Sequence, residues 1–446
     1  MNSPRLPFAT SAPGKVIIFG EHSAVYNKPA IAAALSLRTY LLVTKDELPD
    51  AKDAKITLKF KDIDFESSWT IDELPWHLKS SLGFETKPAI TEELIPELVD
   101  GLSIPLSKIT SALHYSSAFA FLYLFVSLCS KDTIKKGENI TLTVRSTLPI
   151  GAGLGSSASI SVCLASALSY LGGHISKPDI KLNDLTTVES EECKFIDSWS
   201  FMGEKCIHGN PSGIDNAVST HGGAVMFQRT ESSFPSVRTS MRNFPSLNLL
   251  LTNTKVPRRT ATLVGNVSTL VTDYPKISSF LLDAMESIVR EAYNLMLRPF
   301  LDQESHKQLL DLVRINHGLL VSLGVSHPSL EKIKMISDEL QIGETKLTGA
   351  GGGGCAITLL NDNLYDNVDN DNEYKEKIEK SIKLFEKEGF ETFKTTLGGK
   401  GAGILCEFND DEISEILTIE NFINFESRDK IETTVGISKI NEWRFW

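Results

Sequence analysis

Apolar and polar positions along the chain follow two different periods, which predicts a mixture of strands and helices. Runs rich in Val, Ile, Leu and Ala at residues 15–19 and 30–44 indicate buried strands, and residues 20–28 form a polar connection between them. Residues 112–129 are apolar almost throughout, which indicates a helix that is buried on most sides. The first 130 residues therefore predict two buried strands and one buried helix.

The middle of the chain alternates in the same way around one glycine-rich segment. A strand near residues 140–145 precedes the glycines, and helical spacing follows them to about Leu171. A second helix is expected from about Leu185 to Cys206, and the Gly and Pro residues of His208–Gly213 should end it. Residues 214–228 then read as a strand, which would place Asp215 on a strand edge.

The remaining segments complete the expected order of elements. A strand is predicted at residues 246–253 and helices over roughly 258–340, followed by a second glycine cluster and the apolar strand Ala356–Leu360. Residues 45–110 contain five prolines among scattered charges and are expected to form an irregular region with short helices. The polar, Ser-rich passage at 230–245 suggests two domains, at residues 1–232 and 233–446.

Composition narrows the classes of protein that remain. The chain has 446 residues, with 41% hydrophobic and 23% charged residues, which is typical of a folded protein with a large core. The net charge of −12 argues against general nucleic-acid binding, which usually requires a basic surface. The polar residues within 112–129 favour a buried core helix over a membrane span, so we expect no membrane partner.

The cysteines and the chain ends predict a cytoplasmic protein. Six cysteines are dispersed and none forms a C-x-x-C pair, which favours reduced thiols. Residues 1–10 have no apolar signal core. The Asn- and Asp-rich run at 361–373 lacks the glycine and glutamate spacing of a calcium loop and is predicted to be a solvated loop.

The segment Pro149–Ala158 is the strongest candidate for binding a ligand. Gly151, Gly153 and Gly155 allow the left-handed backbone that turns N–H groups toward an anion, and Ser156 opens a helix whose N-terminus attracts negative charge. No lysine follows the glycines, so the segment is not a standard P-loop, and the G-x-G-x-G spacing differs from the dinucleotide fingerprint. From the residues alone, a phosphate-binding loop and a tight turn that binds nothing both remain open.

Three segments together resemble the signature motifs of the GHMP small-molecule kinases. They are Ala12–His22 (APGKVIIFGEH), Pro149–Ala158 (PIGAGLGSSA) and Lys346–Cys355 (KLTGAGGGGC), in the order that this family has them. The resemblance implies an α+β fold of two domains, the first like the second domain of ribosomal protein S5 and the second ferredoxin-like. It places the active site in the cleft between them.

Further stretches resemble the branch of this family that phosphorylates mevalonate. They are Gly203–Val218 and Thr252–Arg258, together with Arg314–Val325, so the resemblance covers nearly the whole chain. It implies transfer of the γ-phosphoryl group of ATP to the C5 hydroxyl of (R)-mevalonate, as a step of isoprenoid and sterol biosynthesis. Two alternatives remain open, which are another GHMP kinase such as a phosphomevalonate kinase and a ligand sensor without catalytic activity.

The resemblance also assigns roles to single residues. Asp215 matches the proposed catalytic base and Lys15 the cation beside the reacting hydroxyl and phosphate, while Ser157 and Glu204 match the ligands of Mg²⁺. Without the resemblance, Asp215 reads equally well as a turn residue, Ser157 as a helix cap and Lys15 as a solvated lysine. The residues implied to bind ATP are Lys15, Ser146, Gly151, Ala152, Gly153, Leu154, Gly155, Ser156 and Ser157. Those implied to bind mevalonate are Glu21, His22, Asp215, Thr260, Gly349 and Ala350.

The same resemblance implies properties of the whole molecule. Family members are commonly homodimers, and some are inhibited by prenyl diphosphates that compete with ATP. Mg²⁺ is the expected cofactor, with mevalonate and ATP as the small-molecule partners. His208 is interpreted as a structural residue that braces the loop before Asp215.

Overall fold

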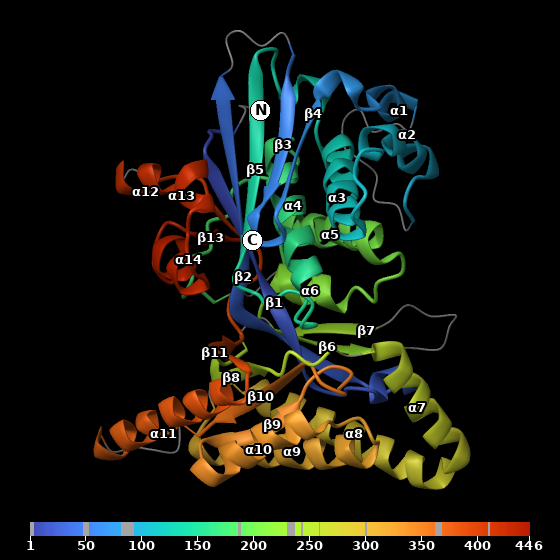
Figure 1. Cartoon of the computed structure of the whole chain (residues 1–446), viewed down its shortest axis with the longest axis vertical. Coiled ribbons are helices and arrows are strands. Elements are labelled where there is room, and N and C mark those ends of the chain that lie inside the picture. Colours follow the sequence, from blue (N-terminus) through green and yellow to red (C-terminus); the bar gives the residue numbers. More distant parts are fainter. Residues whose placement is uncertain are drawn as a thin grey trace.

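Two long strands, β1 (Phe8–Phe19) and β2 (Ala30–Glu47), run through the centre of the molecule and join its two parts (Figure 1). They pair in antiparallel fashion, with a register shift between Pro13 and Lys15. The structure, a computed structural model, describes residues 4–47, 53–81, 93–185, 189–229, 237–241, 244–257, 259–298, 301–361, 368–408 and 411–446. The two predicted strands in this region are confirmed, and both are longer than expected.

The strands of the described residues belong to one mixed sheet in which β2 is central. β2 pairs with β1, β5, β6 and β11, and the only parallel pair among the described strands is β3 with β5. The other strands are β3 (Lys55–Phe60), β4 (Phe65–Thr70), β5 (Glu138–Ser146), β6 (Ala224–Gln228), β7 (Val237–Met241), β8 (Leu247–Asn253), β9 (Gly343–Leu347), β10 (Cys355–Leu360), β11 (Glu391–Leu397), β12 (Gly403–Leu405) and β13 (Arg444–Phe445).

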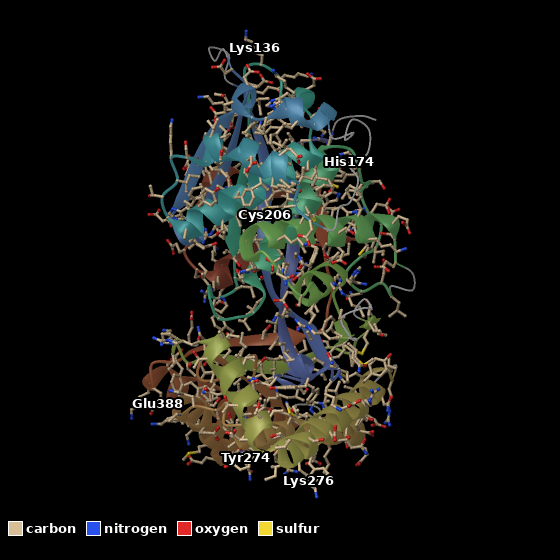
Figure 2. All side chains as sticks on the ribbon, turned by 90° about the vertical axis from the view of Figure 1, so that its right-hand side faces the viewer. Lys136, His174, Cys206, Tyr274, Lys276 and Glu388 are labelled. Carbon is tan, nitrogen blue, oxygen red and sulfur yellow. The ribbon has the colours of Figure 1, made fainter. Side chains whose placement is uncertain are left out.

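Helices α1 to α6 lie on one face of the sheet in the first part of the molecule, and helices α7 to α11 lie on the outer face of the sheet in the second (Figure 1). The first part has α1 (Trp76–Ser81), α2 (Pro96–Leu106), α3 (Ala112–Leu128), α4 (Ser156–Leu171), α5 (Glu191–His208) and α6 (Ile214–His221). The second has α7 (Thr260–Asp273), α8 (Pro275–Met296), α9 (Gln303–Ser322), α10 (Pro328–Leu340) and α11 (Val368–Lys387). In the turned view of Figure 2, Cys206 lies in the first part, and Tyr274 and Lys276 lie at the far end of the second.

The last segment of the chain returns to the first part. β12 pairs with β1, and β13 pairs with β12. The short helices α12 (Asp411–Ile416), α13 (Ile419–Ile423) and α14 (Arg428–Val435) lie on the face of the sheet opposite α3 to α5 (Figure 1). The predicted boundary at residues 232 and 233 stays a prediction, and the first part also contains these C-terminal residues.

The buried helix predicted at 112–129 is confirmed as α3. Ser111 caps its N-terminus by accepting from the His114 amide, and every residue from Ala118 to Leu128 is buried. Packing on all sides explains why its apolar residues show almost no helical periodicity. Among the described residues, we find no helix with the length and apolar character that a membrane span requires. All six cysteines are described, and none of them forms a disulfide bond.

Two predictions of local structure are wrong. Residues 214–221 form helix α6, because Gly213 takes a left-handed conformation at its N-cap and Ala217 and Val218 bury one side of it. Residues 55–70, expected to be irregular, form the hairpin of β3 and β4. Ile56 and Leu58 alternate with polar residues there and face the core, so a strand signal was present between the prolines. A third prediction, the solvated loop at 361–373, is wrong in part, because residues 368–373 begin helix α11, while residues 362–367 lie outside the described residues.

Candidate active site

A pocket of about 630 Å³ lies where the two parts of the molecule meet. Its wall combines residues of β1 and the loop after it, the glycine loop, the ends of α5 and α6, and the segment after β9. Of the predicted site residues, those that line it are Lys15, Glu21, His22, Gly151, Gly153, Leu154, Gly155, Ser156, Ser157, Asp215, Thr260, Gly349 and Ala350. The structure therefore brings segments of all three motifs to one cavity.

The glycine loop has a backbone that only glycine adopts easily. Gly151, Gly153 and Gly155 have φ angles of 72°, 75° and 70°. Gly155 is the N-cap of α4, and no described side chain caps this helix end. The loop is fixed to β1, because the Lys15 amide donates to the Leu154 carbonyl at 2.8 Å. The helix end is thus presented to the pocket with its first amides and its positive dipole end available to an anion.

Lys15 and Asp215 form an ion pair within this pocket. Lys15 Nζ lies 3.2 Å from Asp215 Oδ1, and the lysine side chain is 8% exposed while the aspartate is 33% exposed. Asp215 is in the first turn of α6, where the helix dipole favours its negative charge. The prediction of a strand edge for Asp215 is wrong, but the residue still faces the cavity from a rigid element.

Glu204 and Ser157 lie next to this pair. Burial is the main reason that the pKa of Glu204 rises to about 7, a hydrogen bond from Ser157 opposes the rise, and the charge of Asp215 adds to it. Glu204 Oε1 is buried and has no hydrogen-bond partner among the described residues. A buried carboxylate oxygen without a partner, beside a hydroxyl, suits a hard divalent cation.

The opposite end of the pocket is built across the two parts of the chain. His22 Nε2 donates to the Ala350 carbonyl at 2.9 Å, and the His22 backbone has a φ of 61°. Glu21 lies in the same wall, but its carboxylate is turned away from the cavity toward the buried Lys346 and Asn316. Thr260 closes this end as the first residue of α7.

Two residues predicted to bind ATP do not line the cavity. Ser146 is buried in β5, where its hydroxyl accepts from the Leu148 amide at 3.2 Å and pairs with the Thr39 hydroxyl. Ala152 faces the apolar core, and its carbonyl accepts from Cys355 Sγ. These contacts tie both residues to the surrounding structure, and neither residue lines this pocket.

Comparison with known proteins identifies the family. The family models described as GHMP kinases N terminal domain and GHMP kinases C terminal match residues 120–223 and 297–370. A mevalonate kinase of Candida albicans is 52% identical over 447 residues, which cover 99% of this chain and all of the relative. One from Saccharomyces cerevisiae is 45% identical and covers 91% of this chain and 90% of its own.

The chain belongs to the mevalonate kinases of the GHMP kinase family. The fold agrees with this conclusion. The solved structure of an L. major mevalonate kinase in complex with R-mevalonate superposes with a TM-score of 0.60 at 22% identity, covering 90% of this chain and all of that one. The predicted resemblance and the two-part α+β fold are thereby confirmed, and so is an ATP-dependent kinase activity. The roles of single residues in this GHMP kinase stay predictions.

Three residues of this GHMP kinase were not assigned to the site from the sequence. Lys346 and Asn316 hold Glu21 from behind, and His208 Nε2 lies 3.0 Å from the Ser157 hydroxyl. The structural interpretation of His208 was incomplete, because its side chain also lines the pocket. Lys346 is the first residue of the third motif, so the sequence already drew attention to this position. Only the fold shows that the lysine is buried.

A second polar cluster lies outside the pocket of this GHMP kinase. Cys193 Sγ is 3.2 Å from His221 Nδ1, and Glu189 Oε1 is 3.3 Å from His221 Nε2. These three side chains are of metal-ligand type and lie close together. However, the thiol and the carboxylate contact opposite nitrogens of the ring, so the arrangement is a hydrogen-bonded chain rather than three ligands around one centre.

Proposed function

We propose that this GHMP kinase transfers the γ-phosphoryl group of ATP to the C5 hydroxyl of (R)-mevalonate, giving 5-phosphomevalonate and ADP. The observation that carries the proposal is the ion pair of Lys15 and Asp215 at 3.2 Å, inside a pocket that also contains an uncapped helix N-terminus. The names of the relatives supply the acceptor. The geometry supports a cation and a carboxylate beside one reacting hydroxyl.

The two ends of the pocket would hold the two substrates. The glycine loop and the N-terminus of α4 can bind the phosphates through backbone amides. Apolar side chains beyond them, Phe60, Ile63, Leu113 and Ile150, can pack against the base of a nucleotide. His22, Thr260 and Ala350 lie at the other end, where we place the acceptor alcohol.

Asp215 is proposed to receive the proton of the C5 hydroxyl. A carboxylate is a weak base for an alcohol, so the proton moves late, when bond formation to phosphorus has made the oxygen acidic. Lys15 holds the Asp215 carboxylate in place and adds positive charge where the transition state gains negative charge. Most of the catalysis then comes from positioning and charge, as phosphoryl transfer requires.

Ser157 and Glu204 are proposed to hold Mg²⁺. The buried Glu204 Oε1 atom, without a partner among the described residues, and the neighbouring Ser157 hydroxyl are oxygen donors that fit this ion. When bound, Mg²⁺ neutralises charge on the phosphate oxygens. A site with few protein ligands is expected, since Mg²⁺ normally keeps several waters and binds the phosphates of its nucleotide.

The test is an ADP-release assay with a panel of acceptors at saturating ATP and Mg²⁺. Turnover with mevalonate, and none with phosphomevalonate, galactose or homoserine, is the expected result. Turnover with phosphomevalonate alone would show another GHMP kinase activity. Binding of mevalonate without ADP release would indicate a ligand sensor.

The homodimer, the inhibition by prenyl diphosphates and the cytoplasmic location remain proposals that rest on the family resemblance. Sedimentation of the 49.1 kDa chain at micromolar concentration tests the dimer, which should sediment at twice that mass. A monomer at all concentrations would contradict it. For the inhibition, a prenyl diphosphate should raise the KM for ATP without changing kcat.

A further inference from the structure

A fully buried ion pair connects the two parts of the molecule behind the acceptor end of the pocket. Lys346 Nζ contacts Glu21 Oε1, and both side chains are 0% exposed. Glu21 belongs to the loop after β1, whereas Lys346 is on β9, so the contact joins residues 325 positions apart.

The pair is satisfied by further hydrogen bonds. Lys346 Nζ also donates to the Leu347 carbonyl at 2.8 Å, and Asn316 Nδ2 donates to Glu21 Oε2 at 3.2 Å. Burial raises the pKa of Glu21 and lowers the pKa of Lys346, while the attraction between them opposes both shifts. Removing one partner would therefore leave the other buried without compensation, which is far more unfavourable than removing both.

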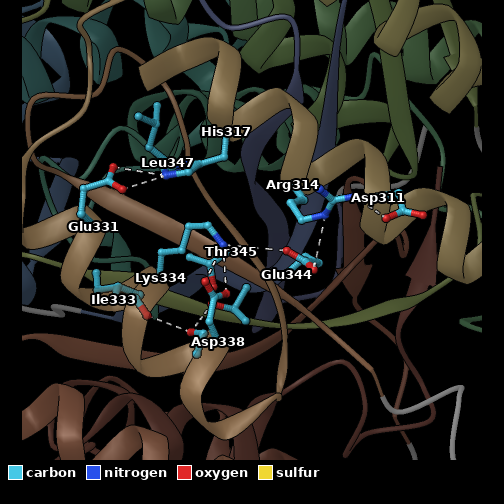
Figure 3. Close-up of polar contacts among 12 residues, drawn as sticks. Asp311, Arg314, His317, Glu331, Ile333, Lys334, Asp338, Glu344, Thr345 and Leu347 are labelled. Atoms are coloured by element: carbon cyan, nitrogen blue, oxygen red, sulfur yellow. Dashed lines mark hydrogen bonds and ion pairs between the residues drawn. The ribbon is translucent and has the colours of Figure 1, made fainter. Parts of the chain in front are cut away.

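Helix α9 holds this pair from the side. Asn316 contacts Glu21, and the adjacent His317 accepts the Leu347 amide at Nδ1, at 3.3 Å. Because Nδ1 accepts this bond, the ring carries its proton on Nε2, which faces Glu331 at 3.2 Å, and burial lowers the pKa of His317. Figure 3 shows this chain of contacts from Glu331 through His317 to Leu347.

The pocket wall follows directly in sequence from both members of the pair. His22 comes after Glu21 and is held at a φ of 61°, a conformation that a non-glycine residue rarely takes. Thr348 Oγ1 donates to the Ile17 carbonyl at 2.8 Å, and Ala350 accepts from His22 Nε2. The ion pair thus fixes both sides of the His22–Ala350 contact.

We propose that Lys346 is a positioning residue for the acceptor alcohol, acting through Glu21 and His22. It touches no substrate itself. The pair sets the orientation of the His22 ring and the distance between the two sides of the wall at the acceptor end, whereas the glycine loop at the nucleotide end is built without it. The proposal rests on the assignment of this end of the pocket to the acceptor.

The test is a double-mutant cycle of K346M, E21Q and the double variant E21Q/K346M, with kinetics at a temperature where all variants are folded. K346M should lower kcat/KM for mevalonate on the order of 100-fold, the effect that a misplacement of about 1 Å can have, and leave the KM for ATP within about twofold. The double variant should be no worse than the poorer single variant, because no buried charge is left alone.

Lys28 provides the matched control. It also links the loop after β1 to the second part, through Asp283 and Glu286 at 2.8 and 2.7 Å, but this link is partly exposed. K28M should change kcat/KM for mevalonate less than threefold, since exposed ion pairs contribute little. An equal effect of K28M and K346M would overturn the proposal.

Two further results would also overturn it. One is a K346M variant with a lowered Tm but normal kinetics for mevalonate, which would make Lys346 purely structural. The other is losses in the two single variants that add in the double variant. Failure of the proposed function is distinguished from these outcomes by the wild-type assay. If the wild-type protein does not phosphorylate mevalonate, the proposed function is wrong, whereas the variants test only the role of Lys346.

Discussion

Lys15 on β1 and Asp215 on α6 meet at 3.2 Å, although 200 residues of sequence separate them. Lys15 lies within β1 and lines the pocket, and Gly213 precedes the helix that presents the aspartate. The glycine loop lies against the same lysine, since Leu154 accepts the Lys15 amide. The glycine loop has no lysine of its own, and the sheet brings a lysine from a distant strand to the same pocket.

Replacing Asp215 by Asn should reduce kcat by about 10²- to 10⁴-fold, because the amide cannot receive the proton of the alcohol. The fold should persist, since the side chain is partly exposed and the shape is unchanged. Steady-state kinetics and thermal unfolding of the same preparation check this. Full activity in D215N would remove Asp215 from the mechanism.

Binding of Mg²⁺ with nucleotide should weaken as the pH falls through about 7. Burial raises the pKa of Glu204 to about 7. Below that pH a proton occupies the Glu204 carboxylate and competes with the metal, and above that pH the carboxylate is charged and can bind the metal. Calorimetric titration of Mg²⁺ and nucleotide at pH 6, 7 and 8 measures the effect. E204Q should bind weakly at all three values, and a wild-type affinity that does not change with pH would contradict the assignment.

Gly155→Ala should damage activity more than Gly151→Ala does. Both positions have a positive φ, so both substitutions introduce backbone strain of about 1–2 kcal/mol. A Cβ at Gly155 would lie 2.8 Å from Lys15 Cγ, whereas one at Gly151 would meet nothing within 4 Å. We expect kcat to fall at least tenfold in G155A and less than threefold in G151A, with similar losses of Tm. Equal kinetics in the two variants would show that the loop does not position Lys15.

The free energy of unfolding should decrease as the pH rises from 6.5 to about 10, through deprotonation of His221. Its pKa is raised from 6.5 to about 10. Burial opposes the rise, and contacts with Asp197 and Cys193 outweigh it. The folded state therefore binds this proton more tightly than the unfolded state, so the stabilisation is complete below pH 6.5 and is lost as the pH passes about 10. In H221Q, the free energy of unfolding measured with urea should decline less over the same pH range. If this free energy depended on pH in H221Q as it does in the wild type, the raised pKa of His221 would be contradicted.

The sequence predicted the buried elements well where burial shows in local spacing. α3 and the strands β1 and β2 were expected because continuous apolar runs leave few alternatives. α6 was missed, because eight residues after a glycine carry too little periodicity to separate a helix from a strand. The hairpin β3–β4 was missed because its alternation stands among prolines and charges that suggest a loop.

Only those residues of the candidate site that lie in recognisable sequence motifs could be assigned to it from the sequence. The motifs led to Lys15 and Ser157 and the stretch Gly203–Val218 led to Asp215, but none of them indicated that Lys346 would be buried against Glu21. That contact depends on the packing of β9 and α9 against the loop after β1, which no local pattern contains. Ser146, close to the loop in sequence, points into the structure instead, because its hydroxyl pairs with the Thr39 hydroxyl on β2 and accepts from the Leu148 amide.

The most direct test of the central claim is the identity of the phosphorylated product. Wild-type protein is incubated with ATP, Mg²⁺ and (R)-mevalonate, and the product is analysed by proton–phosphorus NMR correlation, with D215N as the control. We expect one phosphomonoester coupled to the C5 methylene protons, formed in equal amount to ADP, and none above background with D215N. ADP formation without a phosphorylated mevalonate, or a phosphoryl group on another oxygen, would contradict the account.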